Sequence, residues 1–271
     1  MIAHRIDVGL RPVGRIALAV GCGVLGIVAL QDRHGSDALR PLVVGDLAGL
    51  ATGGALVLLS LGLPFRATRT WSARGLAAYW LAWLALGHRF SPRGFTHDPS
   101  DLVAWLEVLV LAMTAVVLSP ATEPSEQTGS RFADLAFIAT RIVFGVMLVV
   151  FGLVHLTYPA AISAMLPQGF PARTVWPWLT GTASCAAGIA LVFGLGARLA
   201  AVLVGAMFVS WLPLVHVARL IAEPSRAEWV FAATALSLAG AAWMLAPRAV
   251  GAVQPIASSP PPEEPGPLEV S

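Results

Sequence analysis

The sequence has few charged residues and no lysine. Only 12% of its 271 residues are charged, and all 17 basic residues are arginine, whereas a soluble domain carries about 25% charged residues. The formal net charge is +2, and no run of basic residues could bind a phosphate backbone. The composition therefore excludes water as the solvent for most of the surface and argues against a nucleic-acid partner.

Motifs for catalysis and metal binding are also scarce. Cys22 and Cys185 lie inside apolar runs, so they predict neither a disulfide framework nor a CxxC redox motif. His88, His97 and His216 lack the spacing of metal ligands. We find no glycine-rich phosphate loop, nucleophile–base arrangement or acid/base carboxylate pair. We therefore expect neither metal nor haem, and the sequence favours a protein that is not an enzyme.

Long apolar runs fill most of the chain, whose mean hydropathy is +0.77. A membrane span needs roughly 20 apolar residues. Eight segments meet or approach this length, so we predict an all-α membrane protein with eight transmembrane helices. The expected spans are Gly14–Leu30, Pro41–Leu63, Gly75–Gly87, Leu102–Ser119, Leu135–Thr157, Thr174–Leu195, Leu199–Val217 and Trp229–Ala246.

The chain divides at a polar, linker-like break after Pro120, and the two sides resemble each other. Arg15 and Arg141 are 126 positions apart, and Asp101 and Glu228 are 127 apart. Gly54 pairs with Gly188 at an offset of 134, and residues 76–78 pair with 199–201 at 123. We predict two parallel four-helix repeats, at residues 1–120 and 135–248. A linker at 121–134 joins them, and a disordered Pro/Glu-rich tail follows at 249–271.

Arginine near the span ends predicts the orientation. With the N-terminus inside, ten arginines lie on the cytoplasmic side and seven on the outer side. This bias predicts that both termini are cytoplasmic. The bilayer is the first expected partner.

The second half resembles the DoxX-like family of bacterial membrane proteins. The resemblance rests on Gly152-x-x-His155-x-x-Tyr158-Pro159, the proline-rich connector that follows, Trp178-Leu179-Thr180-Gly181, and the stretch from Gly188 to Ala201. It implies a four-helix membrane unit in the bacterial cytoplasmic membrane, with the first half a degenerate copy. Two positions depart from the pattern: Ser184 stands where many relatives carry glutamate, and Ala29 stands where the second half has His155.

Four residues of this motif region are candidates for ligand binding: His155, Tyr158, Trp178 and Thr180. His155 either donates a hydrogen bond to a quinone carbonyl or another head group, or it bonds to the connector backbone as an ordinary helix-end histidine. Tyr158 and Trp178, with Trp176, either stack on a ligand ring or anchor the protein at the headgroup level.

Glu107 is the fifth candidate, because it is a carboxylate within the fourth expected span. It is either a proton or cation site, or a group that pairs with a neighbouring arginine or reaches the outer surface. Gly181, Ser184 and Gly188 follow helical spacing and predict a small-residue face for close helix packing.

Three functions are consistent with these features. The resemblance implies a non-catalytic subunit or scaffold for a membrane redox or envelope complex, with another membrane or membrane-associated redox protein as partner. The alternative is an oxidoreductase component that binds a quinone near His155 and Tyr158. The repeat and Glu107 suggest a third function, a transporter of small molecules or lipids.

Overall fold

The computed structural model describes residues 2–31, 46–87, 99–119 and 131–246, and these residues form helices joined by turns, with no strand among them. The all-α prediction is therefore confirmed for the described chain. The elements are α1 (Ile2–Gln31), α2 (Asp46–Gly62), α3 (Arg69–Ala82), the π-helical turn η2 (Trp83–Gly87), α5 (Pro99–Leu118), α6 (Arg131–Thr157), α7 (Pro159–Met165), α8 (Trp176–Phe193), α9 (Ala197–Trp211), the π-helical turn η4 (Leu212–His216), α10 (Val217–Ala222) and α11 (Arg226–Leu245).

Six helical segments of the described chain are long and apolar enough to cross a membrane, compared with the eight predicted. The other two expected spans correspond to α2, with 17 residues, and α3, with 14. At 1.5 Å per residue each is shorter than the roughly 30 Å hydrocarbon layer. The six segments are Gly9–Gln31, Asp101–Leu118, Arg131–Thr157, Trp176–Phe193, Ala197–Ala222 and Arg226–Leu245.

The predicted linker and tail lie largely outside the described residues, which omit 120–130 and 247–271. Within the described chain α6 begins at Arg131, four residues before the expected boundary of the second repeat.

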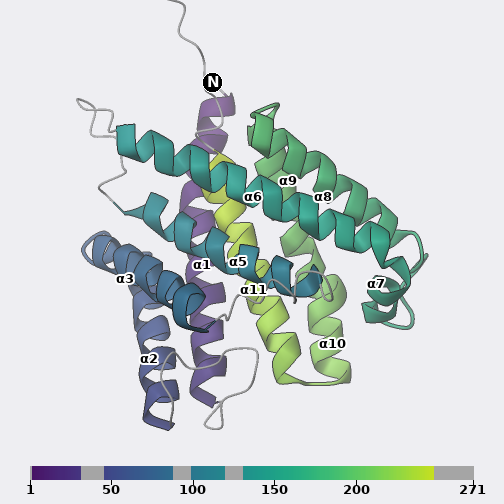
Figure 1. Cartoon of the computed structure of the whole chain (residues 1–271), viewed down its shortest axis with the longest axis horizontal. Helices are drawn as coiled ribbons and strands as arrows, with labels where there is room; N and C mark the ends of the chain where they lie inside the picture. Colours follow the sequence, from purple (N-terminus) through teal and green to yellow (C-terminus); the bar gives the residue numbers. More distant parts are fainter. Residues whose placement is uncertain (1, 32–45, 88–98, 120–130, 247–271) are drawn as a thin grey trace, which may run out of the picture.

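Five helices form a closed ring. Figure 1 shows α8, α9 and α10 on one side of the view, α2 and α3 on the other, and α1, α5 and α11 between them. Around the ring, α5 packs on α6, α6 on α8, α8 on α9, α9 on α11, and α11 on α5. We call this set the second ring, because four of its members come from the second half.

A first ring shares α5 and α11 with the second. Here α11 packs on α1, α1 on α2, α2 on α3, and α3 on α5. The first helix of each half therefore packs against the last helix of the other half: α1 against α11, and α6 against α5. We call this arrangement the helix exchange. It joins the two halves through the packing of α1 on α11 and of α5 on α6.

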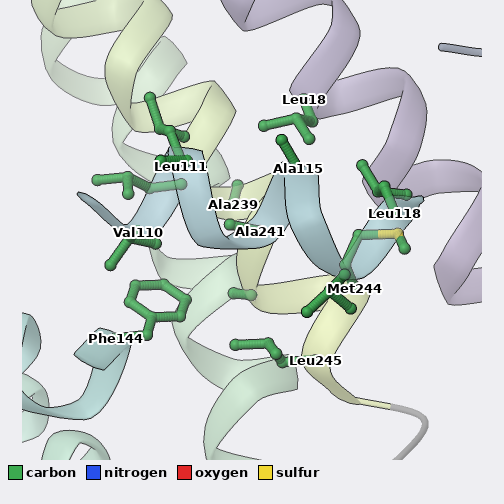
Figure 2. Close-up of a cluster of buried hydrophobic side chains, with 14 of the residues drawn as sticks. Leu18, Val110, Leu111, Ala115, Leu118, Phe144, Ala239, Ala241, Met244 and Leu245 are labelled. Atoms are coloured by element: carbon green, nitrogen blue, oxygen red, sulfur yellow. The ribbon is translucent and has the colours of Figure 1, made fainter. Parts of the chain in front are cut away.

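The two rings meet in an apolar core where α5 and α11 cross (Figure 2). Leu118 of α5 and Leu245 of α11 are both buried there. Leu18 of α1 and Phe144 of α6 reach the same cluster, with exposed fractions of 1% and 0%. Small side chains such as Ala115 and Ala239 let the helix backbones approach closely.

Glycine creates the close contact between α6 and α8. A Cβ atom on Gly188 would lie 2.5 Å from the carbonyl oxygen of Gly145, and one on Gly152 would lie 2.6 Å from that of Gly181. Gly181, Ser184 and Gly188 are all buried along this contact. The predicted small-residue face on the sixth span is therefore confirmed.

Gly54 and Gly188, which the predicted repeat pairs, lie in different environments. A Cβ on Gly54 would meet nothing within 4 Å, whereas Gly188 packs against the backbone of α6. The two glycines share an amino-acid type but not an environment.

We expect Gly188→Ala to destabilise the protein and Gly54→Ala to leave its stability unchanged or slightly raised. The added methyl at residue 188 meets backbone that has to move, and such overpacking costs about 1–3 kcal/mol. Thermal unfolding of the purified protein in detergent measures the effect. Equal melting temperatures for the two variants would contradict the packing described for α6 and α8.

Candidate functional site

A cavity of about 380 Å³ lies inside the second ring. Ligand pockets in proteins usually measure about 300–1,000 Å³, so this one has room for a small molecule. Helices α5, α6, α7, α8, α9 and α11 and the turn η4 all contribute to its wall. The wall is mainly apolar, and its aromatic members are Phe151, Trp176, Phe208, Trp211 and Phe231.

Three of the five predicted site residues line this cavity: Glu107 from α5, His155 from α6 and Thr180 from α8. The fold brings them together from three helices and from both sides of the predicted linker. Tyr158 and Trp178 are absent from the wall, and their exposed fractions are 47% and 53%. Their exposure is consistent with the second interpretation given above, in which Tyr158 and Trp178 anchor the protein at the headgroup level.

His155 is oriented by its own helix. Its Nδ1 atom lies 2.9 Å from the carbonyl oxygen of Phe151, one turn earlier, and its ring lies 4.2 Å from the Phe151 ring centroid. A carbonyl oxygen only accepts hydrogen bonds, so Nδ1 carries the hydrogen. The neutral ring then has a free acceptor at Nε2. The partner is thus a helix carbonyl, not the connector backbone.

Thr180 and Glu107 differ in their hydrogen bonding: the Thr180 side chain has a partner among the described residues and the Glu107 side chain has none. The Thr180 hydroxyl donates to the carbonyl oxygen of Trp176 at 2.7 Å, which leaves its oxygen lone pairs available. The Glu107 side chain is partly buried and has neither a hydrogen bond nor an ion pair with the residues that the structure describes. The pairing with a neighbouring arginine that the sequence left open is absent from this part of the chain.

The connector between α6 and α8 forms part of the cavity wall, through Ile162, Met165 and Leu166. Arg173 donates to the carbonyl oxygen of Ser163 at 2.9 Å, and the Ser163 hydroxyl donates to the Arg173 carbonyl at 3.2 Å. Phe170, Trp176 and Trp211 form an aromatic triangle with ring centroids 5.5 to 6.1 Å apart. Such edge contacts add about 0.5–1.5 kcal/mol beyond burial, so the triangle holds the connector against α9.

An ion pair ties the connector to α11. The Arg219 guanidinium contacts the Glu228 carboxylate at 2.6 Å and donates to the carbonyl oxygen of Met165 at 2.7 Å. Glu228 is 4% exposed, and its backbone N–H is capped by Ser225 at the start of α11. Arg219 therefore connects α10, α11 and the end of α7 around the cavity rim.

The seventh expected span is interrupted at the cavity. Pro213 lies in the turn η4, and proline removes a backbone donor and clashes with the preceding turn of an α-helix. The wider π-helical turn accommodates it and places Val215 and His216 in the cavity wall. Nδ1 of His216 lies 4.0 Å from Glu228, beyond hydrogen-bond distance.

Three further residues line the cavity that were not predicted from the sequence: Trp211, His216 and Thr234. The signal for Trp211 and His216 was Pro213 between them, which marks a break in an otherwise regular apolar helix. Thr234 carried no such signal. Among the described residues no group of three His, Cys, Asp or Glu side chains could hold a metal ion.

The spans define a multi-pass helical membrane protein, and its second ring contains a cavity. Residues 136–217 match the DoxX family model, so this part of the chain is a DoxX domain, as the resemblance predicted. The domain covers most of α6 and continues through η4, and it supplies His155, Thr180 and Trp211. Comparisons with curated proteins and with solved structures gave no match.

We expect Arg219→Met to lower the thermal midpoint of the protein. The substitution leaves the buried Glu228 carboxylate without its partner, at a cost of about 1–3 kcal/mol. Adding Glu228→Gln to the same chain should recover part of the loss, because a neutral amide is less costly to bury unpaired.

Thermal unfolding in detergent measures both effects, and Arg66→Met, at an exposed position, is the control. A double variant less stable than Arg219→Met alone would show that the pair does not hold the rim together.

Proposed function

We propose that this DoxX-domain protein binds one small, mainly apolar molecule in the second ring. The observation that carries the proposal is the cavity of about 380 Å³, to whose wall three helices bring Glu107, His155 and Thr180. An apolar pocket with a few converging polar groups is the usual form of a small-molecule site. The ligand would enter from the bilayer, where mainly apolar molecules concentrate.

The cavity favours ligand binding over the scaffold hypothesis. A scaffold requires an outer surface that fits its partner and gains nothing from a hollow interior with polar groups. Polar side chains within membrane helices are costly, and they usually mark a site or a pathway. Such a cavity could hold either a quinone ring or a transported small molecule. The quinone-binding and transporter hypotheses therefore differ in which ligand the cavity binds.

We further infer that the chain is a duplicated four-helix unit with eight spans. Adding 128 to the buried α2 residues Gly53 and Ser60 gives the buried α8 residues Gly181 and Gly188. The same offset relates the buried positions of α3 to those of α9, which replaces the offset of 123. The pairs are Ser72 with Ala200, Ala73 with Ala201, Leu76 with Val204, Ala77 with Gly205, and Trp80 with Phe208.

Interhelical contacts support the same inference. A Cβ on Gly26 would lie 3.0 Å from the carbonyl oxygen of Gly53, and the positions 126 and 128 residues later are Gly152 and Gly181, which also meet. The short helices α2 and α3 would then occupy the places of α8 and α9. With η2 included, α3 continues to Gly87.

We expect a native mass spectrum of protein extracted gently from its own membrane to contain one bound small molecule per chain. Ala235→Phe and Val154→Phe add bulk to the cavity wall and should remove this mass. Ala206→Phe adds the same bulk at an exposed position of α9 and should retain it. Protein that carries only phospholipid, or the same mass in all variants, would contradict the proposed function.

The exchanged helices predict that the halves depend on each other. When a chain cut within residues 121–130 is expressed as two polypeptides, the halves should co-purify in a 1:1 complex. Alone, the second half lacks α5 against α6 and α1 against α11 and should not form a folded monomer. A stable monomeric second half, detected by size-exclusion chromatography and thermal unfolding, would contradict the exchange.

A further inference from the structure

Two polar side chains of the second-ring cavity offer hydrogen-bond acceptors. Nδ1 of His155 uses its hydrogen on the Phe151 carbonyl, so the neutral ring has an acceptor at Nε2. Thr180 uses its hydroxyl hydrogen on the Trp176 carbonyl. The Trp176 indole N–H is also used, because it donates to the carbonyl oxygen of Pro171 at 3.0 Å. Trp211, His216 and Thr234 line the same cavity and carry N–H or O–H donors, so the wall offers donors as well.

Glu107 adds a carboxyl group to this wall. The side chain lines the cavity and has no ion pair with the described residues. An isolated ionised carboxylate in an apolar site is costly unless a positive group accompanies it. The ion pair at the cavity rim, Arg219 with Glu228, is already complete at 2.6 Å. A positively charged ligand would stabilise the ionised form of Glu107.

The aromatic wall fits the same kind of ligand. Trp176 and Trp211 lie edge to face, with centroids 5.5 Å apart, and Phe151 and Phe208 lie 6.2 Å apart on the adjoining helices. All four rings line the cavity. Aromatic faces attract weakly hydrated cations, and they recognise quaternary ammonium groups in this way.

We propose that the second-ring cavity binds a lipophilic organic cation, with Glu107 as its counter-ion and Trp176, Trp211, Phe151 and Phe208 as its aromatic enclosure. The inference rests on the proposed function, since it names the chemistry of the ligand held at the same site. An alkylammonium or aryl-alkylammonium group matches the Glu107 carboxyl group, the aromatic rings and the apolar wall together. The cavity volume of about 380 Å³ accommodates one ring with a compact ammonium head.

The test is binding of tritiated benzyltrimethylammonium to the full-length protein in detergent. We expect saturable binding to the unmodified chain and roughly tenfold weaker binding to Glu107→Gln. Trp211→Leu should also weaken binding, by several-fold, because it removes an aromatic face. Glu223→Gln is the matched control: Glu223 is an exposed carboxylate at the end of α10, outside the cavity wall, and its removal should leave binding unchanged.

Competition separates charge from shape. Neopentylbenzene has nearly the shape of benzyltrimethylammonium without its charge, and it should fail to displace the labelled cation. Equal displacement by neopentylbenzene, or unchanged cation binding in Glu107→Gln, would overturn the inference.

Failure of the cation to bind, with ubiquinol-1 binding instead, would overturn it in favour of a neutral ligand that donates hydrogen bonds. In that case the co-purified mass and its loss in Ala235→Phe would still support the proposed function. If no small molecule co-purifies and Ala235→Phe changes nothing, the proposed function is contradicted as well.

Discussion

The close backbone contact between α6 and α8 is the interaction on which the site depends. Gly152 and Gly181 meet where any side chain would collide with a carbonyl oxygen. His155 lies three residues beyond Gly152 on α6, and Thr180 directly precedes Gly181 on α8. The glycine contact therefore sets the distance between the two helices. It also fixes where His155 and Thr180 lie along the helix axes, because both are close to it in sequence. The connector that follows His155 can then fold back over the opening.

The DoxX domain alone does not complete the ring. Residues 136–217 supply α8, α9 and most of α6, but α5 and α11 lie outside them and close the remaining wall. Glu107, which brings a carboxyl group to the cavity wall, comes from α5 and thus from the first half of the chain. In the proposed duplication, the first ring has Trp80 at the position of Phe208 and Ala29 at that of His155, both buried. The larger indole of Trp80 and the absence of an imidazole at Ala29 favour side-chain packing in the first ring. The smaller Phe208 and the imidazole of His155 favour ligand binding in the second ring.

Much of this arrangement could be predicted from the sequence. Apolar runs predicted the helices, and the spacing of Gly181, Ser184 and Gly188 predicted the packed face of α8, because both signals are local. Glu107, His155 and Thr180 were identified as candidates from their polarity and motif. Trp211 and His216 were missed because the turn at Pro213 changes which residues face inward. The packing of α1 against α11 depends on tertiary contacts. The environments of Gly54 and Gly188 also depend on tertiary contacts, so the shared residue type did not predict them.

The central claim is that the second ring holds a ligand, whereas the side chain of Trp80 is buried in the first ring. The most direct measurement is an experimental density map of the protein extracted gently from its own membrane. The account predicts non-protein density among Glu107, His155 and the rings of Trp176 and Trp211, and none beside Trp80. A second ring closed by its own side chains, or α6 packed against α11 instead of α5, would contradict it.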